Sequence, residues 1–248
     1  PPSFRTGTGT SVILMAIEPV DAIILAGGAG SRIMPVLGET PKVLAPIHDE
    51  PFLKYLVRYL ADSAVVRKVI IAAGYQADQI VNYCDQNPMQ LPIAFSIETS
   101  PLGTGGALIN ALPEATGETV LVVNGDSYVD LDLAEMVAFH TANSADATLA
   151  AVQVEDARAS GTLALDENRI IAFAEKTEDT GPGWINAGLY IFERVGLENF
   201  SSGSSSLERD IMPRLIEGNV QACKTNRPFI DIGTPGNYAR TEEFFREF

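Results

Sequence analysis

Residues 22–32 read Ala-Ile-Ile-Leu-Ala-Gly-Gly-Ala-Gly-Ser-Arg, an apolar run that passes directly into a glycine-rich loop. The run Ala22–Leu25 is typical of a buried strand. Consecutive glycines let a backbone approach a ligand closely and present N–H groups to phosphate oxygens. Ile33 stands where a dinucleotide fingerprint needs its third glycine, and Gly-Ser-Arg replaces the Gly-Lys-Ser/Thr of a P-loop. The stretch is therefore another kind of phosphate loop or a tight turn after a strand.

Apolar runs alternate with amphipathic stretches on both sides of this loop, from Asp21 to Asp156. Strands separated by helices are typical of an α/β sheet with parallel strands. We expect an α/β fold with a Rossmann-like mixed, mostly parallel sheet flanked by helices. The predicted strands are Ala22–Leu25, Val69–Ala73, Ile93–Ile97, Val120–Val123 and Thr148–Val154, and the predicted helices are Phe52–Ala61, Ala77–Cys84, Gly105–Leu112 and Leu133–Thr141.

The rhythm changes after Asp156, where short apolar runs follow one another closely. They predict a small β-rich excursion that ends at Phe192. Beyond it, Pro213 should kink or stop a helix, because proline has no N–H to donate. The segments predicted here are a hairpin of Thr162–Asp166 and Ile170–Glu175, a strand Ile185–Phe192, a helix Leu207–Glu217, strands Val220–Lys224 and Phe229–Ile232, and a closing helix Tyr238–Phe248.

No linker divides the 248 residues. We therefore expect a single domain over residues 15–248, preceded by a flexible N-terminal arm over residues 1–14. The first methionine is Met15, so either the natural start lies near it or the preceding residues form a mobile arm.

The charge balance excludes one class of partner and leaves another open. Lys and Arg number 17 against 32 Asp and Glu, a formal net charge of −15. A nucleic-acid groove needs a basic stripe, whereas a few local cations and a divalent metal can hold a small phosphorylated ligand in an acidic protein.

Two separated cysteines and two histidines support neither a disulfide framework nor a zinc site. No apolar run reaches the ~20 residues of a membrane span, so we expect a cytoplasmic protein without nucleic-acid or membrane partners.

Seven short motifs occur in one order along the chain. The glycine loop ending at Arg32 is followed by Thr40-Pro41-Lys42, Pro101-Leu102-Gly103-Thr104-Gly105-Gly106, Asn124-Gly125-Asp126, Glu175-Lys176, Ile185-Asn186-Ala187-Gly188 and Asp231-Ile232-Gly233-Thr234-Pro235. In this order and spacing they resemble the sugar-1-phosphate nucleotidyltransferases, from about Ala16 to Phe248. Among the members of this family, the chain is most similar to the short guanylyltransferases that act on heptose 1-phosphate or mannose 1-phosphate.

The resemblance implies transfer of a nucleotidyl group from a nucleoside triphosphate to a sugar 1-phosphate, with Mg²⁺ as cofactor and pyrophosphate as the second product. Three alternatives stay open: a non-catalytic subunit that binds sugar nucleotides, an enzyme that uses UTP or dTTP, and a metal-dependent glycosyltransferase, whose Asp-x-Asp pattern Asp130 and Asp132 match. Whether the chain forms a homo-oligomer is also open.

The resemblance assigns catalytic roles to Arg32, Lys42 and Asp126. Arg32 would hold pyrophosphate oxygens, Lys42 would stabilise charge at the α-phosphorus, and Asp126 with Asp231 would bind Mg²⁺. Because the reaction needs no covalent protein intermediate, positioning and charge neutralisation supply most of the catalysis. The alternatives are a solvated surface lysine for Lys42 and ordinary turn chemistry for the two aspartates.

The resemblance also implies two binding sets. The nucleotide would contact Leu25, Ala26, Gly27, Gly28, Glu98, Gly103, Thr104, Asn124 and Gly125, and the sugar phosphate would contact Glu175, Lys176, Asn186 and Gly188. Glu175 and Lys176 could instead form a surface ion pair, and Asn186 could satisfy the backbone at a strand bend. Gly188 would leave room for the sugar. We expect His48 and His140 to be packing or loop residues, and Trp184 to be packing rather than sugar-lining.

Glu98 suggests which base is bound. An ionised carboxylate only accepts hydrogen bonds. Guanine offers two adjacent donors, its ring N1–H and its amine, whereas uracil and thymine place carbonyl oxygens beside their single N–H. The sequence therefore predicts GTP as the donor substrate, with the alternative that Glu98 points to solvent.

Overall fold

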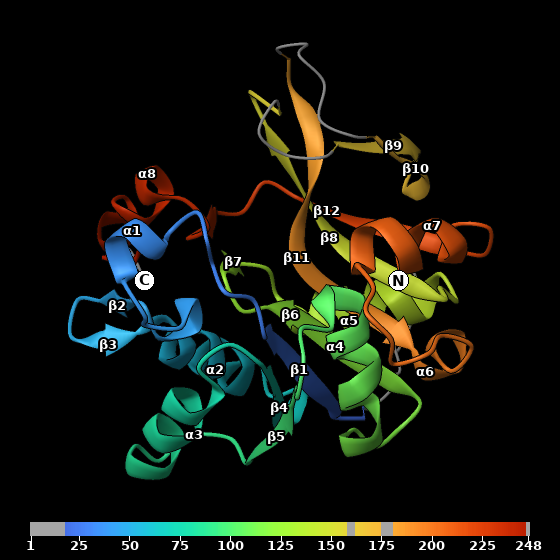
Figure 1. The fold of residues 1–248 in the computed structure, drawn as a ribbon. Coiled ribbons are helices and arrows are strands. Elements are labelled where there is room, and N and C mark those ends of the chain that lie inside the picture. The colour runs from blue at the N-terminus through green and yellow to red at the C-terminus, as the bar shows by residue number, and fades with distance from the viewer. Residues whose placement is uncertain (1–17, 158–161, 175–180, 247–248) are drawn as a thin grey trace, which may run out of the picture.

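A computed structural model describes residues 18–157, 162–174 and 181–246, so the predicted arm over residues 1–14 lies outside the described residues. Its main sheet has nine strands in the order β5-β4-β1-β6-β11-β8-β12-β10-β9 (Figure 1). These strands are β1 Val20–Ala26, β4 Val66–Ala73, β5 Ile93–Ile97, β6 Thr119–Asn124, β8 Ala147–Val154, β9 Thr162–Asp166, β10 Arg169–Ala174, β11 Gly183–Glu193 and β12 Val220–Thr225.

Smaller elements and helices connect the strands. The short strands are β2 Pro46–Ile47 with β3 Glu50–Pro51, and β7 Ser127–Val129 with β13 Phe229–Asp231. The helices are α1 Met34–Leu37, α2 Phe52–Asp62, α3 Ala77–Gln86, α4 Gly103–Ala111, α5 Leu133–Ala142, α6 Arg194–Leu197, α7 Met212–Leu215, α8 Pro235–Tyr238 and α9 Thr241–Phe244, with 3-10 turns η1 Lys42–Leu44 and η2 Leu112–Glu114 and a π-helical turn η3 Leu207–Ile211. No helix in the described ranges is both long and apolar enough to cross a membrane.

The first half of the sheet is parallel. Strands β5, β4, β1 and β6 run in the same direction, with β1 between β4 and β6. The register places Leu25 beside Asn124 and Ala73 beside Ile97. The carboxyl ends of these strands therefore share one edge, where open α/β sheets bind their ligands.

The second half departs from the predicted parallel arrangement. Strand β11 is antiparallel to both β6 and β8, and β10 is antiparallel to β12 and β9. The segments that connect β8, β9, β10 and β11 in sequence are each shorter than the dozen or more residues that a crossover between parallel neighbours requires. A pairing of Ile185 with Thr162 closes the last five strands into a small barrel. The mixed α/β sheet and the β-rich excursion are confirmed, whereas "mostly parallel" is wrong for the sheet as a whole.

Helices cover both faces of the sheet and create two hydrophobic cores. On α2 the apolar residues Phe52, Leu56 and Leu60 recur at helical spacing and are fully buried. They pack with residues of α3 and α5 on one face, while α4, η3 and α7 cover the other. Burial of a large apolar side chain contributes about 1.5–3 kcal/mol, so this spacing determines which face each helix turns inward.

Two predicted helices differ from the structure. The helix predicted over Leu207–Glu217 begins as the π-helical turn η3, in which the Met212 N–H reaches the Leu207 carbonyl. Pro213 follows in the first turn of α7 and offers no N–H to the residue four positions earlier, which favours the wider turn. The closing helix predicted over Tyr238–Phe248 is instead two short helices, because Thr234 caps the first one early at Pro235.

Candidate active site

A cavity of about 420 Å³ lies at the carboxyl ends of the first parallel strands. Six residues of the predicted nucleotide set line it: Leu25, Gly27, Gly28, Glu98, Gly103 and Thr104. Gly74 and Tyr75, which the sequence analysis missed, line it as well. They directly follow β4, so the rule that ligands bind at strand ends could have identified them. Ala26, Asn124 and Gly125 lie at neighbouring strand ends without lining this cavity.

Glu98 lies over the glycine-rich loop. Its Oε2 accepts a hydrogen bond from the Leu102 N–H at 3.0 Å. A Cβ on Gly27 would overlap with Glu98 Oε1, and one on Gly74 would lie 3.1 Å from Oε2. The two glycines therefore make room for this carboxylate. Glu98 lines the cavity, and its Oε1 forms no hydrogen bond with the described residues.

The glycines at the start of α4 make room for the loop around Ser205. The Ser205 carbonyl accepts hydrogen bonds from the N–H groups of Gly105 and Gly106 at 2.9 and 3.2 Å. Gly103 has a φ of +70°, and its Cβ would lie 2.5 Å from the same carbonyl oxygen. The loop around Ser205 thus caps the helix and needs glycines beneath it.

The two predicted metal ligands come together through a two-stranded sheet. The register of β13 with β7 pairs Asp231 with Ser127, so Asp231 lies beside Asp126. The Ile232 N–H donates to the Asp126 carbonyl at 2.8 Å and fixes this approach. A segment more than a hundred residues from Asp126 in sequence therefore completes the acidic pair.

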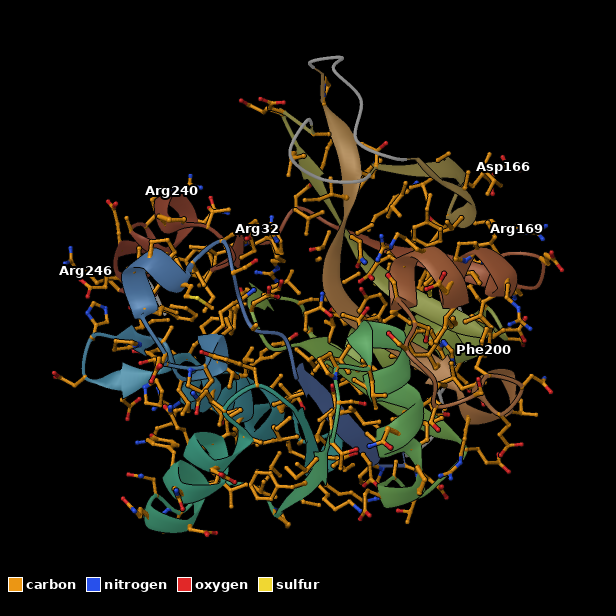
Figure 2. All side chains as sticks on the ribbon, viewed as in Figure 1. Arg32, Asp166, Arg169, Phe200, Arg240 and Arg246 are labelled. Carbon is orange, nitrogen blue, oxygen red and sulfur yellow. The ribbon has the colours of Figure 1, made fainter. Side chains whose placement is uncertain are left out.

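Arg32 and Lys42 converge on this pair. Around the position of a Cβ on Gly233 lie Asp231 Oδ1 at 3.0 Å, Arg32 Nη2 at 3.7 Å and Asp126 Oδ2 at 3.8 Å. Lys42 Nζ is 2.7 Å from Asp126 Oδ2. Arg32 forms no hydrogen bond or ion pair with the described parts of the chain. In Figure 2 its side chain lies between the loop after β1 and strand β11. Arg32 is thus a free guanidinium beside a compensated Lys–Asp pair, which suits a polyanionic ligand.

The acidic pair offers the oxygen ligands that Mg²⁺ uses in proteins. Ser127 donates to Asp126 Oδ1 at 3.1 Å, and Asp231 accepts from the Gly233 N–H at 3.0 Å and from Asn237 Nδ2 at 2.6 Å. Within the described residues, no group of three or more His, Cys, Asp or Glu side chains could form a closed protein cage. Mg²⁺ commonly uses one or two carboxylates and takes its other ligands from water and substrate phosphates.

The predicted sugar side lies on an irregular stretch of β11. Asn186 pairs with Ala151 but Tyr190 pairs with Leu149, so the strand bulges between them. Gly188 lies in the bulge with a φ of +75°, and its Cβ would lie 2.7 Å from Asn124 Nδ2. Gly188 therefore accommodates the Asn124 side chain, which explains this glycine without a sugar. Glu175 and Lys176 lie outside the described residues.

Asn186 hydrogen-bonds the backbone at a strand bend, which was the alternative to a sugar contact for this residue. Its Oδ1 accepts from the Gly188 N–H at 3.0 Å, and its Nδ2 donates to the Tyr190 hydroxyl at 2.6 Å. These bonds fix the amide in one orientation and leave one N–H and one lone pair for a ligand.

Four other residues singled out in the sequence have structural contacts. His140 is buried and hydrogen-bonds Thr148 and Glu193. Trp184 packs at the edge of the second core, and His48 adopts a positive φ in a turn. Asp132 caps α5 by accepting from two backbone N–H groups, so the Asp-x-Asp pattern serves a helix terminus here and the glycosyltransferase alternative loses its support.

The sequence model of a family described as nucleotidyl transferase matches residues 21–247. The chain belongs to the nucleotidyl transferase family. The match covers the loop after β1, the cavity and the acidic pair. This member of the family is therefore a nucleotidyltransferase enzyme.

Individual relatives narrow the comparison. The chain is 37% identical over 236 residues to mannose-1-phosphate guanylyltransferase of Mycobacterium tuberculosis. The match covers 91% of this chain and 64% of that protein. It is 36% identical to D-glycero-alpha-D-manno-heptose 1-phosphate guanylyltransferase of Aneurinibacillus thermoaerophilus, over 92% of this chain and the full length of that protein. The chain thus spans less than two thirds of the mycobacterial relative and all of the other.

Solved structures agree on the fold. HddC from Yersinia pseudotuberculosis superposes with a TM-score of 0.83 at 35% identity, over 91% of this chain and 99% of that one. A second structure of HddC is a complex with GMP-PN, again with a TM-score of 0.83.

Proposed function

We propose that this nucleotidyltransferase transfers a guanylyl group from GTP to a sugar 1-phosphate of the mannose or heptose type and releases pyrophosphate. The convergence of Arg32, Lys42, Asp126 and Asp231 beside the cavity that Glu98 lines carries this proposal. Relatives with these substrates in their names support the choice of base and sugar.

The chemistry is an exchange at the α-phosphorus. An oxygen of the sugar 1-phosphate bonds to the α-phosphorus, and the bond to the β-phosphate oxygen breaks. Arg32, which no carboxylate in the described residues neutralises, would hold the departing pyrophosphate by two parallel hydrogen bonds. Lys42 would neutralise charge on the α-phosphate oxygens. Mg²⁺, held by Asp126 and Asp231, would supply further charge neutralisation to the phosphates.

The ion pair of Lys42 with Asp126 keeps both groups in place before substrate binds. Their side chains are 17% and 29% exposed, so the pair is only partly screened by water. A preorganised charge costs no rearrangement when the transition state forms. The arrangement favours an enzyme over a non-catalytic subunit, because Arg32, Lys42, Asp126 and Asp231 are all present and lie together.

The base preference rests on Glu98. Oε2 is held by the Leu102 N–H and Glu98 lines the cavity, so Oε1 would be the atom that accepts from the base. Guanine can donate two adjacent N–H groups to a carboxylate, whereas uracil or thymine would bring a carbonyl oxygen against it. On the sugar side, the resemblance gives Lys176 to the phosphate and Glu175 with Asn186 to hydroxyl groups.

A substrate panel tests the proposal. The purified chain with Mg²⁺ is offered GTP, UTP or dTTP together with mannose 1-phosphate, heptose 1-phosphate or glucose 1-phosphate, and pyrophosphate is measured. We expect release with GTP and one of the first two sugars. Equal rates with UTP would contradict the base assignment, and no release with any pair would contradict nucleotidyl transfer to these sugars.

A further inference from the structure

Glu208 lies outside every predicted set, yet it joins the two sides of the site. It belongs to the π-helical turn η3, a type of turn that is frequent at functional sites. One carboxylate oxygen, Oε2, lies 3.1 Å from the Thr104 hydroxyl of the cavity wall. The other, Oε1, lies 3.4 Å from the hydroxyl of Tyr190 on β11.

The hydrogens around Glu208 have one consistent arrangement. The Thr104 hydroxyl accepts from the Leu207 N–H at 2.8 Å, and the Ser206 hydroxyl accepts from the Arg209 N–H at 3.2 Å. Each hydroxyl has a single hydrogen, and each directs it to Glu208. Three hydroxyl groups therefore donate to the Glu208 side chain. A carboxylate, which only accepts, can take all three hydrogen bonds, whereas a neutral amide cannot.

The direction of the Tyr190 hydroxyl bond determines how two neighbouring amide side chains are oriented. Tyr190 is fully buried. Its hydroxyl donates to Glu208, so its oxygen can only accept from its other neighbours. Asn186 Nδ2 donates to it at 2.6 Å, and the Asn124 side chain also hydrogen-bonds it. Because Asn124 Oδ1 is buried without a partner in the described structure, the bond to Tyr190 comes from Asn124 Nδ2.

We propose that Glu208 is a positioning residue of the transferase site, which fixes the amides of Asn186 and Asn124 through the Tyr190 hydroxyl and fixes the Thr104 hydroxyl directly. Asn186 is held with Nδ2 toward Tyr190 and Oδ1 toward Gly188. The donor and acceptor that Asn186 presents to a sugar are thereby determined by a carboxylate that touches no sugar. This inference rests on the proposed function only in naming the ligand as a sugar 1-phosphate.

The hydrogen bonds that lead from Glu208 through the Tyr190 hydroxyl to the two amides form a relay. Two variants interrupt this relay at different points. Tyr190→Phe keeps the ring and removes the hydroxyl that accepts from both amides. Glu208→Gln keeps the shape but brings an NH₂ group to a place where every neighbour already donates. We expect each to raise the KM for the sugar 1-phosphate by about tenfold, the effect of one lost oriented hydrogen bond, and to change kcat by less than about threefold.

Tyr59→Phe is the matched control. Tyr59 is also largely buried, and its hydroxyl donates to the Leu131 carbonyl at 2.6 Å. Its removal should lower stability about as much as Tyr190→Phe does, without changing either KM. A purely structural role for Tyr190 would make the two variants behave alike in kinetics as well as in stability.

A double variant tests whether the two residues act in series. In the Tyr190→Phe background, Glu208→Gln should add less than about twofold to the KM for sugar 1-phosphate, because residues of one network are not additive. Independent multiplication of the two effects would overturn the relay, and so would a parental sugar KM in either single variant that folds, as judged by cooperative thermal unfolding. If the parent transfers no nucleotide, the proposed function fails, and calorimetric binding of mannose 1-phosphate to the same variants still decides whether the relay exists.

Discussion

At the residue scale, the site is governed by how each charge is compensated. Lys42 has a carboxylate partner at 2.7 Å, whereas Arg32 forms no ion pair in the described ranges. A compensated cation keeps its position in the absence of ligand, and a free one gains most when a polyanion arrives. The two cations should therefore both matter for turnover, although only one is prearranged.

Arg32→Ala and Lys42→Ala should each reduce kcat by about 10²–10³, which corresponds to ~2.7–4 kcal/mol for one lost charged contact to the transition state. The measurement is pyrophosphate release at saturating substrates. Arg246→Ala is the control, because Arg246 is also an exposed arginine and lies far from Arg32 in Figure 2. Turnover at the parental rate in a folded Lys42→Ala protein would show that Lys42 is a solvated surface residue without a catalytic role.

Asp126→Asn and Asp231→Asn should each shift the Mg²⁺ titration of activity to higher concentrations. An amide keeps the shape of the side chain but removes the charge that attracts a hard cation. Asp85→Asn controls for the loss of one negative charge on the exposed surface of α3. The second-ligand role of Asp231 fails if its variant reproduces the parental titration curve.

Gly27→Ala should reduce the preference for GTP over UTP by about ten- to a hundredfold, because its methyl group would displace Glu98 from the cavity. Glu98→Gln should have a similar effect on the same ratio. Gly28→Ala adds an equal methyl group where no atom lies within 4 Å, so its ratio should stay at the parental value. Competition between the two donors in one reaction gives the ratio directly. A GTP preference that survives Glu98→Gln would assign base selection to the backbone after Glu98.

At the element scale, local patterns predicted most elements but not their contacts. The spacing of Phe52, Leu56 and Leu60 identified α2, and the apolar run after Asp21 identified β1. The bulge of β11 and the π-helical turn η3 have no such period, since they depend on what packs against them. For the same reason Gly103 could be predicted as part of a glycine-rich motif, while its close approach to the Ser205 carbonyl could not.

Gly106→Ala should destabilise the fold by about 1–3 kcal/mol, because a methyl group there would overlap with the Gly203 carbonyl and force backbone to move. In a protein of this size that loss lowers the Tm by about 2–4 °C per kcal/mol. Gly236→Ala is the matched control in α8, where no atom lies within 4 Å of the added carbon. Equal melting temperatures for the two variants would show that the loop over α4 yields easily.

At the scale of the whole molecule, charge is distributed between two ends of the parallel strands. The carboxyl ends hold Arg32, Lys42 and the acidic pair, and this clustering comes from topology that no single segment encodes. The motifs did predict which residues belong to it, because the resemblance supplied the long-range information that periodicity lacks. The amino ends hold Asp21, a fully buried carboxylate that no sequence pattern singles out.

Asp21 ties three central segments together. Its Oδ1 accepts from Arg67 Nε at 2.8 Å, and its Oδ2 accepts from the Thr116 N–H at 2.7 Å, with Lys68 Nζ at 3.4 Å. Burial alone would raise the pKa of Asp21, but the hydrogen bonds from Arg67 and Thr116, together with the charge of Lys68, outweigh it and lower the pKa below its usual value of 3.8. A lowered pKa in the folded state stabilises the fold above the unfolded-state pKa, and this stabilisation is lost as pH falls through the folded-state value.

Asp21→Asn should therefore lower the free energy of unfolding by about 1.5–3 kcal/mol at pH 7, the range for hydrogen bonds to a charged group. The difference between parent and variant should be the same at pH 7 and pH 6 and should shrink below about pH 4, where Asp21 of the unfolded parental chain begins to take up a proton while the folded carboxylate stays ionised. Urea unfolding across this range measures it, with Asp85→Asn as the control for an exposed aspartate. A difference that is constant down to pH 3 would mean that the loss comes from packing rather than from the charge. The KM values for both substrates should not change, since Asp21 lies at the end of the strands opposite to the site.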